Sequence, residues 1–491
     1  MDQYDSAARL TLLDRISDLR VSVLGDAMLD LWHHGEVRRL GREAVVPVLE
    51  EDGQEPAPGG AANCAVNAAA LGARTRFLGI VGDDPAGQSL RAALTAVGVD
   101  AGLVVVDRDA STPVKHRLMS GEAQLARFDT AGSRWSPAAH RQVLDRLVAL
   151  LDDTDLLIVA DYGGGALGDR LPEVLAGVLA EQAVPVVVDG HDFERWAVCR
   201  PTAVTPNTGE ALALLDLPVD HPAPREVLTV RSAQLLERTG AAIVLSTLDA
   251  DGSLLHAPDT RARHTPAQAA RARHTCGAGD TVTAAFGLAL AAGARPEDAA
   301  ELAQEAAAST VERPGTCVCT AADLMARAGG VLPADAVAAA VARHRDAGRR
   351  IVFTNGCFDV LHVGHVRCLE QAREWGDVLV VGVNSDESVR RLKGPERPIV
   401  PDHERAALLA ALATVDLVAI FEEDSPVGLL ELVRPDVYVK GGDYTPDMLE
   451  ETPLVEALGG RVVTLGYLAD HSSTELITRI RSHADQGRRP R

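Results

Sequence analysis

Residues 351–368 read Ile-Val-Phe-Thr-Asn-Gly-Cys-Phe-Asp-Val-Leu-His-Val-Gly-His-Val-Arg-Cys, and they contain the clearest structural signal in the second half of the chain. The apolar run Ile351–Thr354 predicts a buried strand, which ends at Asn355-Gly356. After a short loop, His362 and His365 begin a helix three residues apart, so the two imidazoles share one helix face. The stretch therefore predicts a strand–loop–helix element of an α/β fold.

Two imidazoles at a helix N-terminus suit the binding of a nucleoside triphosphate. Gly364 lets a ligand approach the backbone closely, and the helix N-terminus favours anions. The imidazoles would stabilise charge on an α-phosphoryl group under attack and on the departing pyrophosphate, without a protein nucleophile. Zinc ligation is an alternative, but His-x-x-His alone lacks the third and fourth ligands that zinc takes. Histidines buried in a core without function are a second alternative.

The rest of the chain repeats the strand–loop–helix pattern. Compact apolar runs lie at Val21–Gly25, Leu156–Ala160, Val184–Asp189, Ala242–Ser246 and Val378–Val383. Such runs predict a mostly parallel sheet with both faces covered, so the fold class is α/β. Residues 40–58 alternate less cleanly and contain three prolines, and we expect them to form a small β flap of a few antiparallel strands.

The chain of 491 residues is too long for one ordinary core. Gly329, Gly330 and Pro333 punctuate the segment 322–345, and a new β run begins at Arg350. We therefore expect a first domain over residues 1–325, a linker over 326–345 and a second domain over 346–491.

Composition excludes several classes of protein. The net charge is −22 and the sequence contains no basic stripe, which argues against nucleic acid as a partner. The sequence has no signal peptide and no apolar stretch of about 18 residues, so no membrane partner is expected. Seven cysteines without a Cys-x-x-Cys pair indicate reduced thiols and a cytoplasmic protein.

A glycine-rich motif in the first half, Cys276-Gly277-Ala278-Gly279-Asp280, precedes a run of small residues that predicts a helix. Backbone N–H groups of Gly277 and Gly279 at a helix N-terminus would form an anion site. Asp280 would accept a proton from a substrate hydroxyl while the glycines hold the transferred phosphoryl group. The alternative is that Asp280 only caps the helix.

Several motifs accompany this one in a fixed order: Gly25-Asp26-Ala27-Met28-Leu29-Asp30, Gly59-Gly60, Thr112-Pro113-Val114-Lys115, Ala160-Asp161-Tyr162 and Thr205-Pro206-Asn207-Thr208-Gly209-Glu210. Over residues 18–320 the chain resembles ribokinase-like (PfkB) sugar kinases, and most closely their heptose 7-phosphate kinase branch. The resemblance implies a ribokinase-like α/β/α sandwich with a small β flap. His274 stands where this family usually has Asp, which puts monovalent-cation activation in doubt. Gly163-Gly164 stands where the branch more often has a small residue and Lys.

The resemblance assigns roles to single residues. Asp280 would be the catalytic base, and Gly277, Ala278 and Gly279 would form the anion hole. The Mg–ATP phosphates would lie near Asn207, Thr208, Gly209 and Glu210. The sugar phosphate would contact Asp30, Gly59, Gly60, Asn63, Lys115 and Arg127. Solvated surface charges are the alternative for Lys115 and Arg127, and a helix cap or turn is the alternative for Asn63.

Residues 350–480 resemble the cytidylyltransferase-like nucleotidyltransferase superfamily, in particular the adenylyltransferase half of bifunctional heptose kinase/adenylyltransferases. The resemblance implies a Rossmann-like domain. His362 and His365 would be catalytic, and the nucleotide would be bound by Thr354, Asn355, Gly356, Phe358, Lys393, Arg405, Lys440, Ser473 and Thr474. The alternative for Arg405 is an ordinary charge on a helix face.

These resemblances imply a bifunctional enzyme with ATP and Mg²⁺ as cofactors. The first domain would phosphorylate heptose 7-phosphate at C1, and the second would join heptose 1-phosphate to AMP and release pyrophosphate. A kinase for another sugar phosphate fused to a cytidylyl- or guanylyltransferase is one alternative, and a first domain that only binds sugar is another. Partners would be small sugar phosphates and a nucleoside triphosphate, and kinases of this type often form homodimers through the flap strands.

Overall fold

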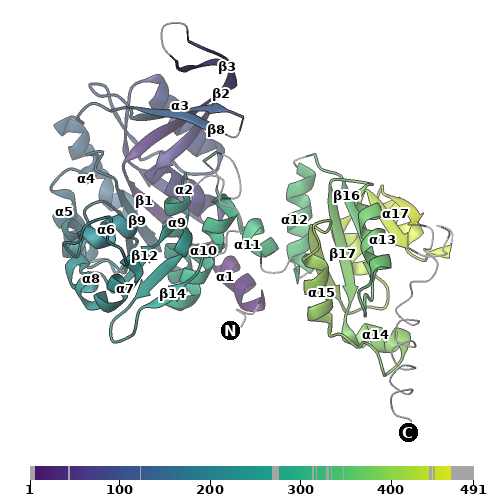
Figure 1. The fold of residues 1–491 in the computed structure, drawn as a ribbon. Coiled ribbons are helices and arrows are strands. Elements are labelled where there is room, and N and C mark those ends of the chain that lie inside the picture. Colours follow the sequence, from purple (N-terminus) through teal and green to yellow (C-terminus); the bar gives the residue numbers. More distant parts are fainter. Residues whose placement is uncertain are drawn as a thin grey trace. The chain divides into compact units, whose positions relative to one another are not determined.

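The computed structural model describes residues 6–41, 45–121, 123–267, 276–311, 315–316, 318–327, 331–332, 334–346, 348–441, 445 and 448–465. The chain forms two compact units, Met1–Leu324 and Met325–Arg491, and each is treated by itself (Figure 1). Across the described ranges, we find no helix that has both the length and the apolar character needed to cross a membrane.

The first unit is built on an eight-stranded sheet with the order β14-β13-β12-β11-β10-β9-β1-β4. Its parallel strands are β1 (Arg20–Gly25), β4 (Arg74–Leu78), β9 (Leu156–Asp161), β10 (Val186–Gly190), β11 (Ala203–Val204) and β12 (Ile243–Thr247). The antiparallel strands β13 (Ser253–His256) and β14 (Arg263–Thr265) complete one edge. The central strands β9 and β10 are buried at every residue, because helices cover both faces, and this confirms the predicted parallel sheet.

Helices pack on both faces of this sheet. One core contains residues of the sheet together with α4 (Pro137–Leu151), α5 (Leu171–Leu179), η1 (Glu194–Cys199), α6 (Thr208–Ala213), α7 (Pro224–Val230) and α8 (Ser232–Thr239). A second group comprises α1 (Ser6–Asp18), α2 (Ala61–Ala70), α9 (Ala278–Ala291) and α10 (Pro296–Val311), in which α9 contacts the other three helices and strands β9 and β10. The unit is therefore an α/β/α sandwich (Figure 1). Its remaining elements are α3 (Pro85–Ala96), η2 (Asp249–Asp251) and α11 (Ala321–Arg327).

A separate four-stranded sheet forms the flap, with the order β3-β2-β7-β8. Its strands are β2 (Ala27–Leu40), β3 (Pro47–Gly60), β7 (Val114–Ser120) and β8 (Ala123–Thr130), and a small ribbon of β5 (Ile80–Gly82) and β6 (Val105–Asp107) lies apart from it. The flap is larger than the expected 40–58 segment, because β2 begins two residues after β1 ends. It is also not purely antiparallel, since β2 pairs with β7 in parallel.

The second unit contains a six-stranded, fully parallel sheet with the order β15-β18-β17-β16-β19-β20. Its strands are β15 (Val331–Leu332), β16 (Ile351–Gly356), β17 (Val378–Asn384), β18 (Leu417–Phe421), β19 (Val437–Gly441) and β20 (Arg461–Leu465). Its helices are α12 (Ala334–Asp346), α13 (Val363–Arg373), α14 (Asp386–Lys393), α15 (Asp402–Ala410), α16 (Val427–Val433) and α17 (Thr452–Ala457). Residues of α13 and α15 share one core with residues of β16 and β17.

The segment 326–345, expected as a linker, is instead part of the second unit. Strand β15 pairs with β18, and α12 contacts β16, β18 and α16. Leu332 of β15 and Val337, Ala340 and Val341 of α12 are buried, because these elements pack on the sheet of the second unit.

Candidate active sites

Asp280 lies in the first turn of α9, near the N-terminus of the helix that begins within the glycine motif. The cap position is Gly277, which has φ 80°, and the Asp280 side chain does not cap the helix. Its Oδ2 accepts a hydrogen bond from Asn63 Nδ2 at 2.7 Å, and its Oδ1 accepts one from the Tyr162 hydroxyl at 2.7 Å. Burial raises the pKa of Asp280, and the bonds from Asn63 and Tyr162 oppose that rise. The alternative of a simple helix cap is therefore wrong.

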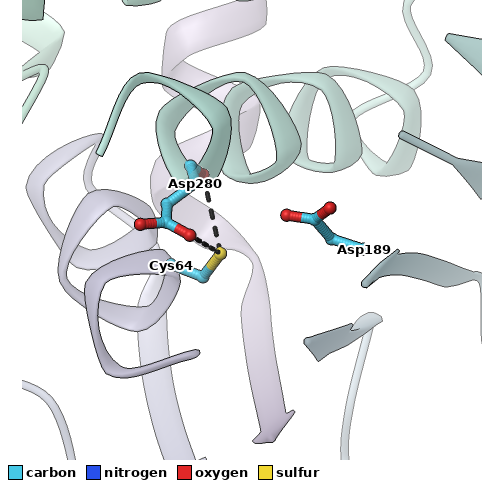
Figure 2. Close-up of side chains that lie close together, drawn as sticks. All are labelled: Cys64, Asp189 and Asp280. Carbon is cyan, nitrogen blue, oxygen red and sulfur yellow. Dashed lines mark hydrogen bonds between the residues drawn. The ribbon is translucent and has the colours of Figure 1, made fainter. Parts of the chain in front are cut away.

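Cys64 and Asp189 lie beside Asp280 and were not identified from the sequence (Figure 2). Cys64 comes from α2 and Asp189 from the carboxyl end of β10, and the three ligand atoms lie within 4.8 Å of one another. Burial raises the pKa of Asp189 to about 7, and the negative charge of Asp280 adds to the rise. Burial also raises the pKa of the Cys64 thiol well above its usual value. The signal for Asp189 was its place at the end of a predicted strand, because ligands of α/β sheets bind at that edge.

The register of the flap places the residues expected around the sugar phosphate on one face. Asp30 is opposite Lys115 and Trp32 is opposite Arg117, while Arg127 is the partner of Arg117 on the next strand. Because strand residues alternate between faces, these side chains project from the same side of the flap. Arg127 lies at an exposed position and forms an ion pair with Asp129.

Arg117, which the sequence did not single out as a site residue, is the cation nearest to Asp30. One of its terminal nitrogens lies 3.6 Å from Asp30 Oδ1, and its guanidinium lies over the Trp32 ring at 5.1 Å. Within the described ranges, Arg117 Nε and Asp30 Oδ1 are buried atoms without a hydrogen-bond partner. Buried polar atoms normally have partners, so this face holds polar groups that a bound polar ligand could satisfy.

The glycine pair and Asn63 pack directly against these groups. A Cβ on Gly59 would lie 3.3 Å from Asp30 Oδ2, and Gly60 has φ 58° at the cap of α2. Asn63 is 1% exposed inside α2 and donates to Asp280. The alternative that Asn63 serves as a cap or a turn residue is therefore wrong.

The segment 207–210 begins α6, at the carboxyl edge of the same sheet. Asn207 Oδ1 accepts from Glu210 N at 3.0 Å, and Glu210 Oε2 accepts from Asn207 N at 2.9 Å, which is a capping box. Thr208 Oγ1 donates to the carbonyl of Thr247, and Gly209 follows in the first turn. Glu210 also contacts His191 at 2.7 Å, and its charge contributes to the raised pKa of Asp189. The structure thus places this segment close to the Asp280 cluster.

In the second unit, His362 is the cap residue of α13 and His365 lies in its first turn. The two rings stack with centroids 3.9 Å apart, and both residues are half-buried. Burial is the largest cause that lowers the pKa of His365 to about 4, and the nearby side chains of His362 and Lys393 are smaller causes. His365 is therefore a neutral imidazole at neutral pH, and neither histidine lies in the apolar core.

The loop after β16 surrounds these rings. Phe358, at φ 46°, places its ring edge-on to His365 with centroids 5.2 Å apart, and a Cβ on Gly356 would meet the Phe358 ring at 3.2 Å. Asn355 Oδ1 accepts hydrogen bonds from Tyr438 Oη and Lys440 Nζ, both at 2.8 Å. Burial lowers the pKa of Lys440. Thr354 is buried within β16.

Arg405 is neither a helix-face charge nor a side chain directed to solvent, since it is 2% exposed. Its guanidinium donates to the carbonyls of Val400, Cys357 and Asn384 and to Asp386 Oδ1. Arg405 therefore holds together the loops that carry the site, and the structure gives it a positioning role in place of the expected nucleotide contact.

Asp359, missed by the sequence analysis, has a similar part. It is fully buried and accepts from the backbone of Ile399 and Val400, and it forms an ion pair with Arg397. It thereby ties the histidine loop to the segment after α14, whose last residue is Lys393. Ser473, Thr474 and His274 lie outside the described residues.

Comparisons with known proteins agree with this division. Residues 18–323 match the pfkB family carbohydrate kinases, and residues 353–479 match the Cytidylyltransferase-like family. The bifunctional protein HldE of Pseudomonas syringae pv. syringae is 41% identical over 480 residues, which is 96% of this chain and 98% of that protein. The bifunctional protein HldE of Halorhodospira halophila is 42% identical over 477 residues, which is 95% of this chain and 98% of that protein.

Two solved structures show the same kinase fold. Phosphofructokinase-2 from Escherichia coli in complex with potassium has a TM-score of 0.53 and 20% identity, over 63% of this chain and 97% of that chain. Ribokinase from Arabidopsis thaliana complexed with ribose and ATP has a TM-score of 0.50 and 21% identity, over 63% of this chain and 98% of that chain. With relatives of about 40% identity over nearly its whole length, the chain belongs to the family of bifunctional HldE proteins, enzymes that join a pfkB-family sugar kinase to a cytidylyltransferase-like nucleotidyltransferase.

Proposed function

We propose that the chain catalyses two reactions on one sugar. The first unit transfers the γ-phosphoryl group of ATP to the C1 hydroxyl of heptose 7-phosphate. The second unit joins heptose 1-phosphate to AMP from ATP and releases pyrophosphate. Removal of the 7-phosphate between the two steps would require a separate phosphatase. The observation that carries the proposal is the presence of two distinct helix N-termini, one with Asp280 and one with His362 and His365.

In the kinase unit, Asp280 acts as the base. It is the half-buried member of its cluster, whereas Cys64 and Asp189 are buried. Asp280 would accept the proton of the C1 hydroxyl as that oxygen attacks the γ-phosphorus and ADP leaves. Arg117, beside Asp30 on the flap face, supplies a cation for the 7-phosphate.

The residues around α9 fit a nucleotide. A Cβ on Gly279 would find no heavy atom within 4 Å, so the backbone there is open to a phosphate. Asn207, Thr208, Gly209 and Glu210 would lie on the nucleotide side of this opening. Mg²⁺, carried by the triphosphate in both units, supplies charge neutralisation.

In the second unit, two imidazoles and a lysine would hold the triphosphate. His362 and His365 donate hydrogen bonds to oxygens of the α-phosphate, and Lys440, already held by Asn355, provides positive charge. Lys393 lies close enough to influence His365 and would contact the departing pyrophosphate. Ser473 and Thr474, which lie outside the described residues, would also bind the nucleotide.

The test uses two single variants of the whole chain. Asp280→Asn should abolish ADP formation that depends on the sugar phosphate, and should leave pyrophosphate release from heptose 1-phosphate and ATP intact. His365→Ala should give the opposite result. Loss of both activities in either variant would refute independent sites, and faster pyrophosphate release with CTP or GTP than with ATP would refute adenylyl specificity.

We also infer a cytoplasmic homodimer. Every cysteine in the described part of the chain is a free thiol, which fits a reducing compartment. All residues of the flap edge strand β8 are exposed, and such an edge can pair with a second copy. Sedimentation of the whole chain at micromolar concentration should give twice the monomer mass, and a monomer would contradict the inference.

A further inference from the structure

The Tyr162 hydroxyl lies between two carboxylates, one of which is the proposed base. Its oxygen is 2.7 Å from Asp280 Oδ1 and 2.7 Å from Asp189 Oδ2. Both distances are typical of O–H···O hydrogen bonds. A phenol has one proton and an ionised carboxylate has none to donate, so one of the two carboxyl groups must supply the second proton.

The surroundings of the two carboxyl groups decide which one holds it. Asp280 lies at a helix N-terminus, which favours a negative charge, and its second oxygen accepts from the amide of Asn63. Asp189 is buried, and its other hydrogen-bond donor among the described residues is the neutral hydroxyl of Thr283, at 3.1 Å. Asp189 is therefore the protonated acid, and Asp280 is the anion.

Charged and titratable groups from other elements also face the cluster. Cys64 from α2 contacts Asp280, Glu210 from α6 acts on Asp189, and Asp30 from the flap acts on Asp280. The His191 ring lies 5.9 Å from Tyr162 but pairs with Glu210. The two acidic neighbours, Glu210 and Asp30, thus oppose a second negative charge in this cluster, while the Cys64 thiol donates to Asp280 and favours its anion.

Asp26 fixes the backbone of the loop that carries Tyr162. This buried carboxylate accepts hydrogen bonds from the backbone of Tyr162, Gly164 and Ala166 at 3.0, 2.8 and 2.9 Å. The phenol is therefore held in place before substrate binds. Because the hydroxyl is hydrogen-bonded to both carboxylates, we assign no metal to the cluster of Cys64, Asp189 and Asp280.

We propose that Asp189 is a carboxylic acid that donates to the Tyr162 hydroxyl, which in turn donates to Asp280. The proposal rests on the proposed kinase function and makes Tyr162 and Asp189 positioning residues of that reaction. The directed pair of hydrogen bonds keeps Asp280 ionised and fixes its Oδ1. Asp280 then receives the proton of the sugar hydroxyl, and Asp189 keeps its own proton throughout.

The test is the pH dependence of kcat/KM for ADP formation by the whole chain. Tyr162→Phe removes a donor to the anionic base, so the acid limb should move up by about one pH unit. Asp189→Asn keeps an uncharged donor, so the acid limb should stay and the alkaline limb, where wild-type Asp189 loses its proton, should disappear. A fall by the same factor at every pH in Tyr162→Phe, or an unchanged alkaline limb in Asp189→Asn, would overturn the proposal.

A second measurement needs no turnover. The infrared spectrum of the wild type at neutral pH should contain a band of a buried carboxylic acid that Asp189→Asn lacks, and identical spectra would overturn the proposal. Thermal unfolding shows whether each variant folds, and Tyr162→Phe decides alone if Asp189→Asn does not. A wild type that shows the band but never phosphorylates a sugar phosphate would refute the proposed function and leave the proton assignment standing.

Discussion

The imidazole rings of His362 and His365 stack on one another, with centroids 3.9 Å apart and planes inclined by 25°. Two charged imidazolium rings at this distance would repel each other, and His365 is also half-buried. The pKa of His365 falls to about 4 as a result, with burial as the larger cause. The site thus offers a neutral imidazole, that of His365, as a donor to phosphate oxygens.

We expect His365→Asn to lower kcat/KM for pyrophosphate release by about 10²–10³, the cost of removing one well-placed donor to a developing charge. Because His365 is neutral in the free enzyme, the ratio of wild-type to variant kcat/KM should stay constant from about pH 6 to 8. Measuring both proteins over this range tests the statement. A ratio that collapses as the pH rises would show that the wild type works through an imidazolium.

The glycines of the α9 motif provide a matched pair of substitutions. Gly279→Ala adds a methyl group with no heavy atom within 4 Å, so the free energy of unfolding should change by less than about 0.5 kcal/mol. The added methyl group should nevertheless block the approach of a phosphate to the backbone. ADP formation should fall by about 10²-fold. A Cβ at Gly277 would lie 2.6 Å from Asn63 Nδ2, and Gly277 has φ 80°, so Gly277→Ala should also lower the free energy of unfolding by about 1–3 kcal/mol. Thermal unfolding and ADP assays separate the two, and equal destabilisation would contradict the geometry.

Local sequence patterns predicted the strands and both helix N-termini. The run Ile351–Thr354 became β16, and the strand predicted over Val184–Asp189 became β10. Apolar periodicity carries this information because each buried strand must be apolar by itself. The segment expected as a linker joins the second unit because β15 pairs with β18, which lies far away in sequence.

The contacts between the site residues could not be predicted from local sequence patterns. Tyr162 contacts Asp280 across 118 residues of sequence, and Arg117 meets Asp30 only through the register of the flap. Arg405 was expected to bind the nucleotide, with a helix-face charge as the alternative, because a helix pattern does not show which loops close over a side chain. Such contacts follow from the tertiary arrangement, so one sequence indicates the groups but not their pairs.

Arg405 should be important for the stability of the second unit. Arg405→Met leaves three carbonyls and Asp386 without their donor. The free energy of unfolding of this unit should therefore fall by about 3–5 kcal/mol. Arg391→Met is the matched control, because its ion pair with Asp424 is about half exposed and should contribute about 0–1 kcal/mol. Urea unfolding followed by Trp375 fluorescence measures both, and equal effects would contradict a buried role for Arg405.

His256 should make the first unit sensitive to acid. It is fully buried between Ser246 and Ser232, and burial lowers its pKa to about 4. The unfolded chain, with a histidine pKa of about 6.5, binds more protons than the folded chain between these two values. The free energy of unfolding should therefore fall by up to about 3 kcal/mol as the pH drops from about 6.5 to 4, with no contribution from His256 above that window. His256→Gln should remove this pH dependence of the free energy of unfolding, whereas His403→Gln, at an exposed position, should leave it in place. Urea unfolding of the wild type and both variants at several pH values measures the slopes. Equal slopes in the three proteins would contradict the assignment.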